Sequence, residues 1–167
     1  DFRLIRRPGT QRFIAGTADG FHSYRMAEGP RLERCELSWT CDDFVNIHGF
    51  FSMVYAVEDE TTVLIASPFG QSFSAGKDIS FYRYQDMNPA GSARITSMEK
   101  ISDSAMVNDA VKIMPAERKV RDFPFGVLFR VKLGTPVATE KYALVDDDGA
   151  CGTGFVIRNC FFHDNNA

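Results

Sequence analysis

The sequence predicts an all-β chain in which partial parallel β-helix coils are interrupted by an inserted small β-barrel or sandwich. Two repeats predict the coils: L-E-R-C-E-L at 32–37 returns as I-R-N-C-F-F at 157–162, and A-D-G-F-H-S-Y at 18–24 returns 23 residues later as C-D-D-F-V-N-I at 41–47. A coil of a parallel β-helix needs about that many residues, and equivalent positions recur every ~4.8 Å along the stack. Short, evenly punctuated apolar runs in the middle of the chain predict the insertion.

The chain divides where these patterns change. Residues 1–51 and 151–167 are expected to form the coils, and residues 52–150 the inserted β-barrel-like domain. The alternative is a single irregular β-sandwich in which the repeats are coincidental. The cysteines favour two structural units, because all of them lie in the flanks. They match no metal-binding spacing and are interpreted as small core residues, with a disulfide less favoured. These cysteines are Cys35, Cys41, Cys151 and Cys160.

The middle of the chain is rich in β-branched and aromatic residues, and its runs are bounded by Gly, Pro, Asn or Asp. Such runs are typical of strands. Residues 54–66 contain two runs around an acidic turn and predict a hairpin, whereas residues 100–111 predict a single helical turn. Further strands are predicted at 78–84, 92–98, 110–114, 126–133 and 141–145.

The composition excludes several classes of partner. A net charge of −3 over 167 residues gives no global attraction to nucleic acid or to an anionic membrane. No apolar stretch approaches the ~20 residues of a membrane span, and the first residues carry no apolar signal core. Both ends are expected to be cuts through a longer protein, so the sequence leaves the compartment unknown.

The acidic pair Asp42 and Asp43 opens an alternating apolar run that ends at His48. If the coils stack, Asp19 lies beside this pair and three carboxylates share one exposed ledge. Repulsion between close carboxylates lets one stay protonated while its neighbours are ionised, and glycoside hydrolysis needs such a division of roles. The structural alternative is that these acids are turn residues, Asp19 before Gly20 above all.

Four segments carry a resemblance to a known fold: T-A-D-G-F-H-S (17–23), G-P-R-L-E-R-C-E (29–36), C-D-D-F-V-N-I-H-G (41–49) and G-T-G-F-V-I-R-N-C-F-F-H-D-N-N-A (152–167). They resemble successive coils of the pectate-lyase-like right-handed parallel β-helix. The greatest resemblance is to bacterial α-1,3-galactosidases that act on blood-group-B-type galactosides. In that family the β-helix is interrupted by inserted barrel domains, which is similar to the block at 52–150. The resemblance implies that this chain is a fragment.

The resemblance also implies roles for individual residues. Asp42 becomes the general acid, and Asp19 and Asp43 become general bases for a water that attacks with inversion of a terminal α-galactoside or related sugar. His22 and His48 become candidates for sugar contacts. No cofactor and no metal are expected, and the resemblance favours an extracytoplasmic location.

Trp39 is a candidate from the residues themselves, because an indole ring is a suitable platform for a sugar ring. The alternative is that this single Trp is a core residue.

Two other functions stay open. The chain is alternatively a non-catalytic carbohydrate-binding or surface-attachment module, or less favourably a polysaccharide lyase. A carbohydrate is the expected partner, with no nucleic acid and no membrane. The isolated fragment is expected to be inactive, and unpaired strand edges at exposed coil ends predict self-association.

Overall fold

The computed structural model describes residues 1–68, 74–110, 126–147 and 149–165. The chain forms two compact units: unit 1 comprises Asp1–Gly49 with Ala150–Ala167, and unit 2 comprises Phe50–Gly149. The division into domains at 1–51, 52–150 and 151–167 stays a prediction, because compactness alone does not show that either unit is an independent domain.

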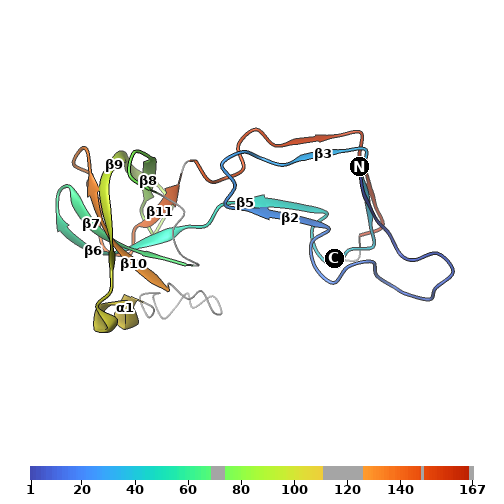
Figure 1. The fold of residues 1–167 in the computed structure, drawn as a ribbon, viewed down its shortest axis with the longest axis horizontal. Coiled ribbons are helices and arrows are strands. Elements are labelled where there is room, and N and C mark those ends of the chain that lie inside the picture. Colours follow the sequence, from blue (N-terminus) through green and yellow to red (C-terminus); the bar gives the residue numbers. More distant parts are fainter. Residues whose placement is uncertain (69–73, 111–125, 148, 166–167) are drawn as a thin grey trace. The chain divides into compact units, whose positions relative to one another are not determined.

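Unit 2 contains a closed barrel of six strands in the order β10-β7-β6-β11-β8-β9, and every neighbouring pair is antiparallel (Figure 1). The barrel closes through β9 and β10. The strands are β6 (Ser52–Asp59), β7 (Thr62–Ser67), β8 (Asp78–Tyr82), β9 (Pro89–Ile101), β10 (Val127–Leu133) and β11 (Leu144–Asp147).

Nearby residues in the sequence determine two connecting segments of this barrel, a hairpin turn and a short helix. The hairpin predicted at 54–66 is confirmed as β6 and β7, and Asp59 closes its turn by accepting a hydrogen bond of 2.8 Å from the Thr61 amide. Helix α1 (Ser104–Ala110) confirms the helical turn predicted near 100–111. Asp103 caps this helix, because its Oδ1 accepts the Ala105 amide at 2.8 Å. The strand predicted at 110–114 lies outside the described residues except Ala110, which ends α1.

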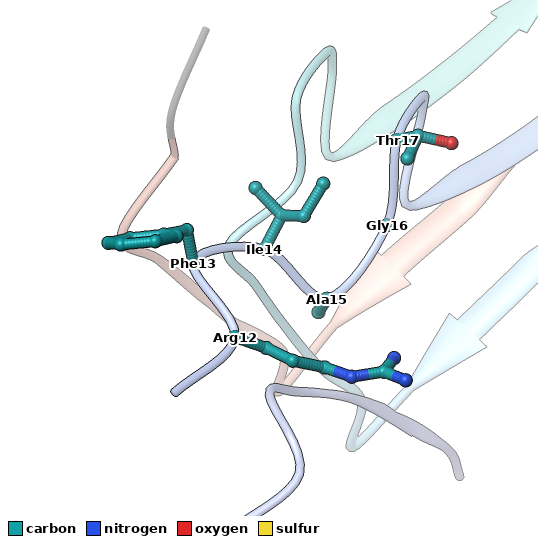
Figure 2. Close-up of a pocket in the computed structure, with 6 residues that line it drawn as sticks. All are labelled: Arg12, Phe13, Ile14, Ala15, Gly16 and Thr17. Carbon is teal, nitrogen blue, oxygen red and sulfur yellow. The ribbon is translucent and has the colours of Figure 1, made fainter. Parts of the chain in front are cut away.

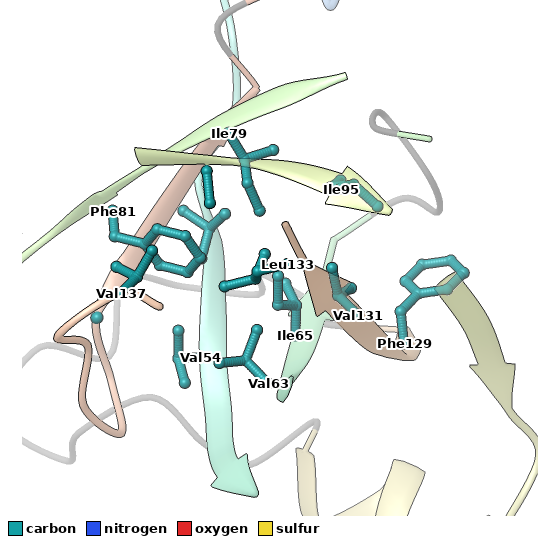
Figure 3. Close-up of a cluster of buried hydrophobic side chains, with 13 residues drawn as sticks. Val54, Val63, Ile65, Ile79, Phe81, Ile95, Phe129, Val131, Leu133 and Val137 are labelled. Atoms are coloured by element: carbon teal, nitrogen blue, oxygen red, sulfur yellow. The ribbon is translucent and has the colours of Figure 1, made fainter. Parts of the chain in front are cut away.

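The barrel interior is packed with apolar side chains from alternate strand positions (Figure 3). Phe81 and Val145 illustrate this packing, since they are at most 1% exposed. Side chains that point to one face of each strand meet inside a closed barrel of this size and fill it. Further members of this core include Val54, Val63, Ile65, Ile79, Ile95, Val131 and Leu133.

The predicted fold class requires a correction. The all-β class is right, but parallel β-helix coils of the pectate-lyase-like kind are not shown, and the largest organised body is the antiparallel barrel. The described strands of unit 1 are two to four residues long and form three separate small sheets. Short repeats specify which strands pair, whereas a β-helix requires several stacked coils with continuous sheets. The sheets are β1 (Arg3–Leu4) with β4 (Glu36–Ser38) and β13 (Phe161–His163), β12 (Val156–Arg158) with β3 (Arg31–Glu33), and β2 (Phe21–Tyr24) with β5 (Val45–His48).

The repeat at 32–37 and 157–162 corresponds to parallel pairing within unit 1. Leu32 lies opposite Ile157 in the pair β3 (Arg31–Glu33) and β12 (Val156–Arg158). Leu37 lies opposite Phe162 in the pair β4 (Glu36–Ser38) and β13 (Phe161–His163). Equivalent letters of the repeat are therefore neighbours across the strands.

The prediction that all four cysteines are core residues is wrong in part. Cys35 is buried, Cys151 and Cys160 are half-buried, and Cys41 is exposed. Cys41 lies in the bend that immediately precedes the acidic pair, which leaves its side chain at the surface. Within the part of the chain that the structure describes, no disulfide joins any of the four. Within the described residues no helix is long and apolar enough to cross a membrane.

A charged cluster joins the three strands of the sheet β1-β4-β13, in which β1 spans Arg3–Leu4. Glu36 accepts a 2.7 Å hydrogen bond from Arg3 and lies 3.3 Å from His163 Nε2. Asp164 lies 2.8 Å from His163 Nδ1. These contacts, the one with Asp164 first, raise the pKa of His163. Arg3 in turn holds the pKa of Glu36 below its usual value.

His163 should make the stability of the chain depend on pH. A raised pKa means that its contribution is fully present below the unfolded-state pKa of about 6.5 and is lost as pH rises through the folded pKa. His163→Gln should therefore lower the denaturant midpoint at about pH 6 and have a smaller effect at alkaline pH. Asp164→Asn should change the midpoint in the same direction. A pH-independent difference between wild type and His163→Gln would contradict the ion pair.

Candidate functional site

The candidate site lies on one face of a short parallel strand pair in unit 1. Strand β2 (Phe21–Tyr24) pairs with β5 (Val45–His48), and the register places His22 opposite Asn46 and Tyr24 opposite His48. Successive side chains of a strand point to opposite faces, so these four polar residues share one face. His22 and Tyr24 are exposed, while Phe21 and Ser23 on the other face are half-buried.

The sequence repeat places this register one residue away from its observed position. The repeat aligns Asp19 with Asp42, an offset of 23 residues, whereas Phe21 lies opposite Val45 in the paired strands. The offset between the strands is therefore 24 residues. Phe44 does not occupy the position opposite Phe21, because its ring stacks on Phe162 with a centroid distance of 5.6 Å. The register of β2 against β5 therefore follows from side-chain packing and not from the alignment of identical residues in the repeat.

The structure nevertheless brings the three predicted carboxylates together. One carboxylate oxygen each from Asp19, Asp42 and Asp43 lies within 4.8 Å of the others. Asp42 and Asp43 are exposed, while the Asp19 side chain is only 10% exposed. Three like charges at this distance repel one another, so the cluster favours a positive neighbour.

The carboxylates of Asp19 and Asp42 are held by different partners. Asp19 Oδ2 accepts a 3.1 Å hydrogen bond from Asn46 Nδ2 and lies 3.2 Å from His22 Nδ1. Asp42 Oδ1 accepts the Asp43 amide at 3.0 Å. The backbone carbonyl of Asp42 accepts 2.9 Å and 3.2 Å hydrogen bonds from Thr40 Oγ1 and Asn165 Nδ2. Asp19 is therefore oriented by side chains, and Asp42 by a fixed backbone turn.

The two histidines predicted as sugar contacts touch each other. His22 Nε2 lies 2.7 Å from His48 Nε2, and His48 Nδ1 lies 2.7 Å from the carbonyl oxygen of Gly49. The Tyr24 ring stacks on His48 with a centroid distance of 6.2 Å and an angle of 23° between the planes. The histidines thus form one unit with Asp19, and their contact with a sugar stays a prediction.

Sequence reasoning missed Asn46 and Tyr24 as site residues. Both belong to the polar face of β2 and β5, on which they alternate with His48 and His22. The period-two pattern in F-H-S-Y and V-N-I-H was the signal that identifies them.

Trp39 lies against a different part of unit 1. The Arg6 guanidinium lies 3.4 Å from the centroid of its ring. Together with Arg7 and His163, these residues help to line a surface cavity of about 300 Å³. The role of Trp39 as a platform for a sugar ring stays a prediction, and a sugar that stacks on Trp39 would bind in this cavity.

Another surface hollow, of about 540 Å³, is lined by residues 12–17, which precede Asp19 (Figure 2). Its lining is mostly apolar, and the Phe13 side chain is 86% exposed. Figure 2 shows that one continuous segment supplies all six of these residues.

Comparison with known proteins gives one distant similarity, and no family model matches the chain. The chain is 24% identical over 123 residues to Alpha-1,3-galactosidase B of Bacteroides thetaiotaomicron. The alignment covers 70% of this chain and 20% of that protein. The chain thus spans about a fifth of the length of the curated relative that it matches. It is similar, at a distance, to a protein named as a galactosidase.

Proposed function

We propose that this chain carries the acid cluster of a glycoside hydrolase that cleaves a terminal α-galactoside or related sugar by inverting attack of water. The observation that carries the proposal is the approach of the Asp19, Asp42 and Asp43 carboxylates to within 4.8 Å of one another. The distant similarity to an alpha-1,3-galactosidase supports galactose as the sugar.

The contacts of each carboxylate support a division of roles. Asp42 is exposed and is assigned as the acid that protonates the leaving glycosidic oxygen as its bond to the anomeric carbon breaks. Asp19 and Asp43 are assigned as bases that accept a proton from the attacking water as its oxygen bonds to that carbon. Asn46 and His22 both approach Asp19 Oδ2, which stabilises a negative charge there.

The spacing of the carboxylates makes the stereochemistry of the product informative. Inverting pairs usually stand about 6.5–9.5 Å apart and retaining pairs about 5–5.5 Å apart. The nearest oxygen atoms of the three carboxylates lie within 4.8 Å of one another, which is closer to the retaining spacing. The inverting proposal is supported by the resemblance to α-1,3-galactosidases. It requires the anomeric carbon to lie between Asp42, on the side of the leaving oxygen, and the water that Asp19 and Asp43 hold on the opposite face.

The product anomer tests the proposal. The intact protein should release galactose from chromogenic α-galactosides and α-1,3-linked galactosides, and proton NMR should show β-galactose as the first product. α-Galactose as the first product would contradict inversion and make one aspartate a nucleophile. Sugar binding without cleavage would contradict the hydrolase and favour the carbohydrate-binding alternative. An unsaturated product from a uronic acid substrate would favour the lyase.

Gly20 tests whether close approach of the two strands assembles the cluster. A Cβ atom at this position would lie 2.8 Å from the Phe44 carbonyl oxygen and 3.1 Å from Thr40 Cγ2, so Gly20→Ala must displace backbone. Because Asp19 precedes this residue, hydrolysis should fall by up to about 10²-fold. Gly16→Ala is the matched control, since its Cβ would meet Leu4 at an ordinary 3.7 Å. Equal activity of the two variants would contradict the idea that close approach of the strands at Gly20 is needed to assemble the three carboxylates.

A further inference from the structure

A continuous chain of contacts runs from Asp19 through two imidazole rings to the backbone. Asp19 Oδ2 lies 3.2 Å from His22 Nδ1, His22 Nε2 lies 2.7 Å from His48 Nε2, and His48 Nδ1 lies 2.7 Å from Gly49 O. Each of the four ring nitrogens therefore faces an oxygen or another ring nitrogen.

These contacts favour a particular number of protons on the two rings. A neutral imidazole has one N–H and one lone pair, whereas a carbonyl or an ionised carboxylate oxygen only accepts. His48 Nδ1 lies 2.7 Å from Gly49 O and carries a proton when it donates to this carbonyl. A proton on His22 Nδ1 is favoured by the Asp19 carboxylate, whose Oδ2 lies 3.2 Å away. A third proton is needed between the two Nε2 atoms, because two lone pairs 2.7 Å apart would repel. Three protons on two rings give the pair one positive charge.

We propose that His22 and His48 form a histidine–histidinium pair that shares a proton between its Nε2 atoms and acts as a positioning unit for Asp19. The negative charge of Asp19 balances the positive charge of the pair. The pair rests on the contacts alone, whereas its effect on catalysis rests on the proposed hydrolase function.

The surroundings of the pair are consistent with a shared positive charge. Asp19, Asp42 and Asp43 supply negative charge from the turns that precede β2 and β5, and three carboxylates so close together favour a positive neighbour. Tyr24 of β2 stacks on His48, while His22 Nδ1 and Asn46 Nδ2 approach the same Asp19 oxygen. The backbone of His48 is also held, because Arg25 N donates to His48 O at 3.1 Å. These contacts hold both rings and the carboxylate in one orientation.

The positioning role differs from direct sugar binding in its kinetic consequence. Asp19 is assigned to the attacking water, so loss of the pair reorients a base and leaves the sugar contacts in place. His48→Gln should lower kcat by about 10–100-fold with little change in KM. A rise in KM at unchanged kcat would overturn the positioning role and make these histidines sugar contacts.

NMR tests the shared proton without any measurement of activity. The chain of 167 residues contains three histidines, so selective ¹⁵N-histidine labelling gives at most six ring nitrogen signals. We expect a scalar coupling between His22 Nε2 and His48 Nε2 through the hydrogen bond, and protonated shifts at both Nδ1 atoms. His48→Gln should abolish the coupling. His163→Gln, which removes the third histidine, should leave the coupling unchanged.

Failure of this inference is distinguishable from failure of the hydrolase proposal. Two results would overturn the pair even if galactosides are cleaved. One is the absence of the coupling in a chain with an intact amide spectrum, and the other is a chemical shift showing that Nδ1 of either ring carries no proton. Persistence of the coupling in an intact protein that cleaves no glycoside would confirm the pair and contradict the hydrolase.

Discussion

Asp42→Asn should lower galactoside hydrolysis by the intact protein by about 10²–10⁴-fold, the usual contribution of a general acid. Asparagine keeps the size of the side chain and still accepts the Asp43 amide, which donates to Asp42 Oδ1 at 3.0 Å, so the turn should persist. It has no carboxylic acid proton to give to the leaving oxygen. The loss should therefore appear in kcat, as measured with initial rates over a range of substrate concentration.

The leaving group makes this test specific for an acid. A galactoside of dinitrophenol needs little protonation as it leaves, so Asp42→Asn should cost much less with it than with a galactobiose. Glu28→Gln is the control, because it removes an exposed carboxylate from the same unit and should leave the rate unchanged. An equal loss with both substrates would contradict Asp42 as the acid and favour a role in binding or charge balance.

Local sequence patterns predicted which acids meet in the site, but they did not predict the hydrogen-bonding contacts between its side chains. Asp19 and the Asp42-Asp43 pair were predicted as neighbours from a repeated motif, and their oxygens lie within 4.8 Å of one another. The contact between His22 and His48 is diagonal across two strands, so it depends on the register, which the motif misplaced by one residue. Such contacts follow from backbone pairing and ring packing, and no spacing along the sequence encodes them.

The fold shows the same division between local and global information. The alternation in 54–66 predicted a hairpin, because both its strands and its turn are specified by nearby residues. The repeat at 32–37 and 157–162 predicted which strands lie together. It did not specify how many strands a sheet contains, since that depends on coils stacking one on another. The prediction of a β-helix is therefore wrong in how the paired strands assemble into larger sheets, and not in which strands pair.

Phe81→Ala should destabilise unit 2 by about 3–5 kcal/mol, the usual cost of truncating a fully buried Phe. Phe81 is 0% exposed and belongs to the core cluster inside the barrel (Figure 3). Removing the ring loses its burial and leaves a cavity that a closed barrel cannot collapse around, because its strands are paired on both sides. Urea unfolding followed by circular dichroism should therefore show a lower midpoint with an unchanged slope.

Two further variants make this result interpretable when Phe81→Ala leaves too little folded protein to measure. Phe81→Leu keeps an apolar side chain of intermediate size and should give a smaller loss in the same direction. Val57→Ala in β6 is the control, because Val57 is 41% exposed and its truncation should change stability by only about 0.5 kcal/mol. If Phe81→Ala cost no more than Val57→Ala, the barrel interior would not be the stabilising core of unit 2. A graded loss from Val57→Ala through Phe81→Leu to Phe81→Ala is expected, because burial of apolar side chains holds the barrel closed.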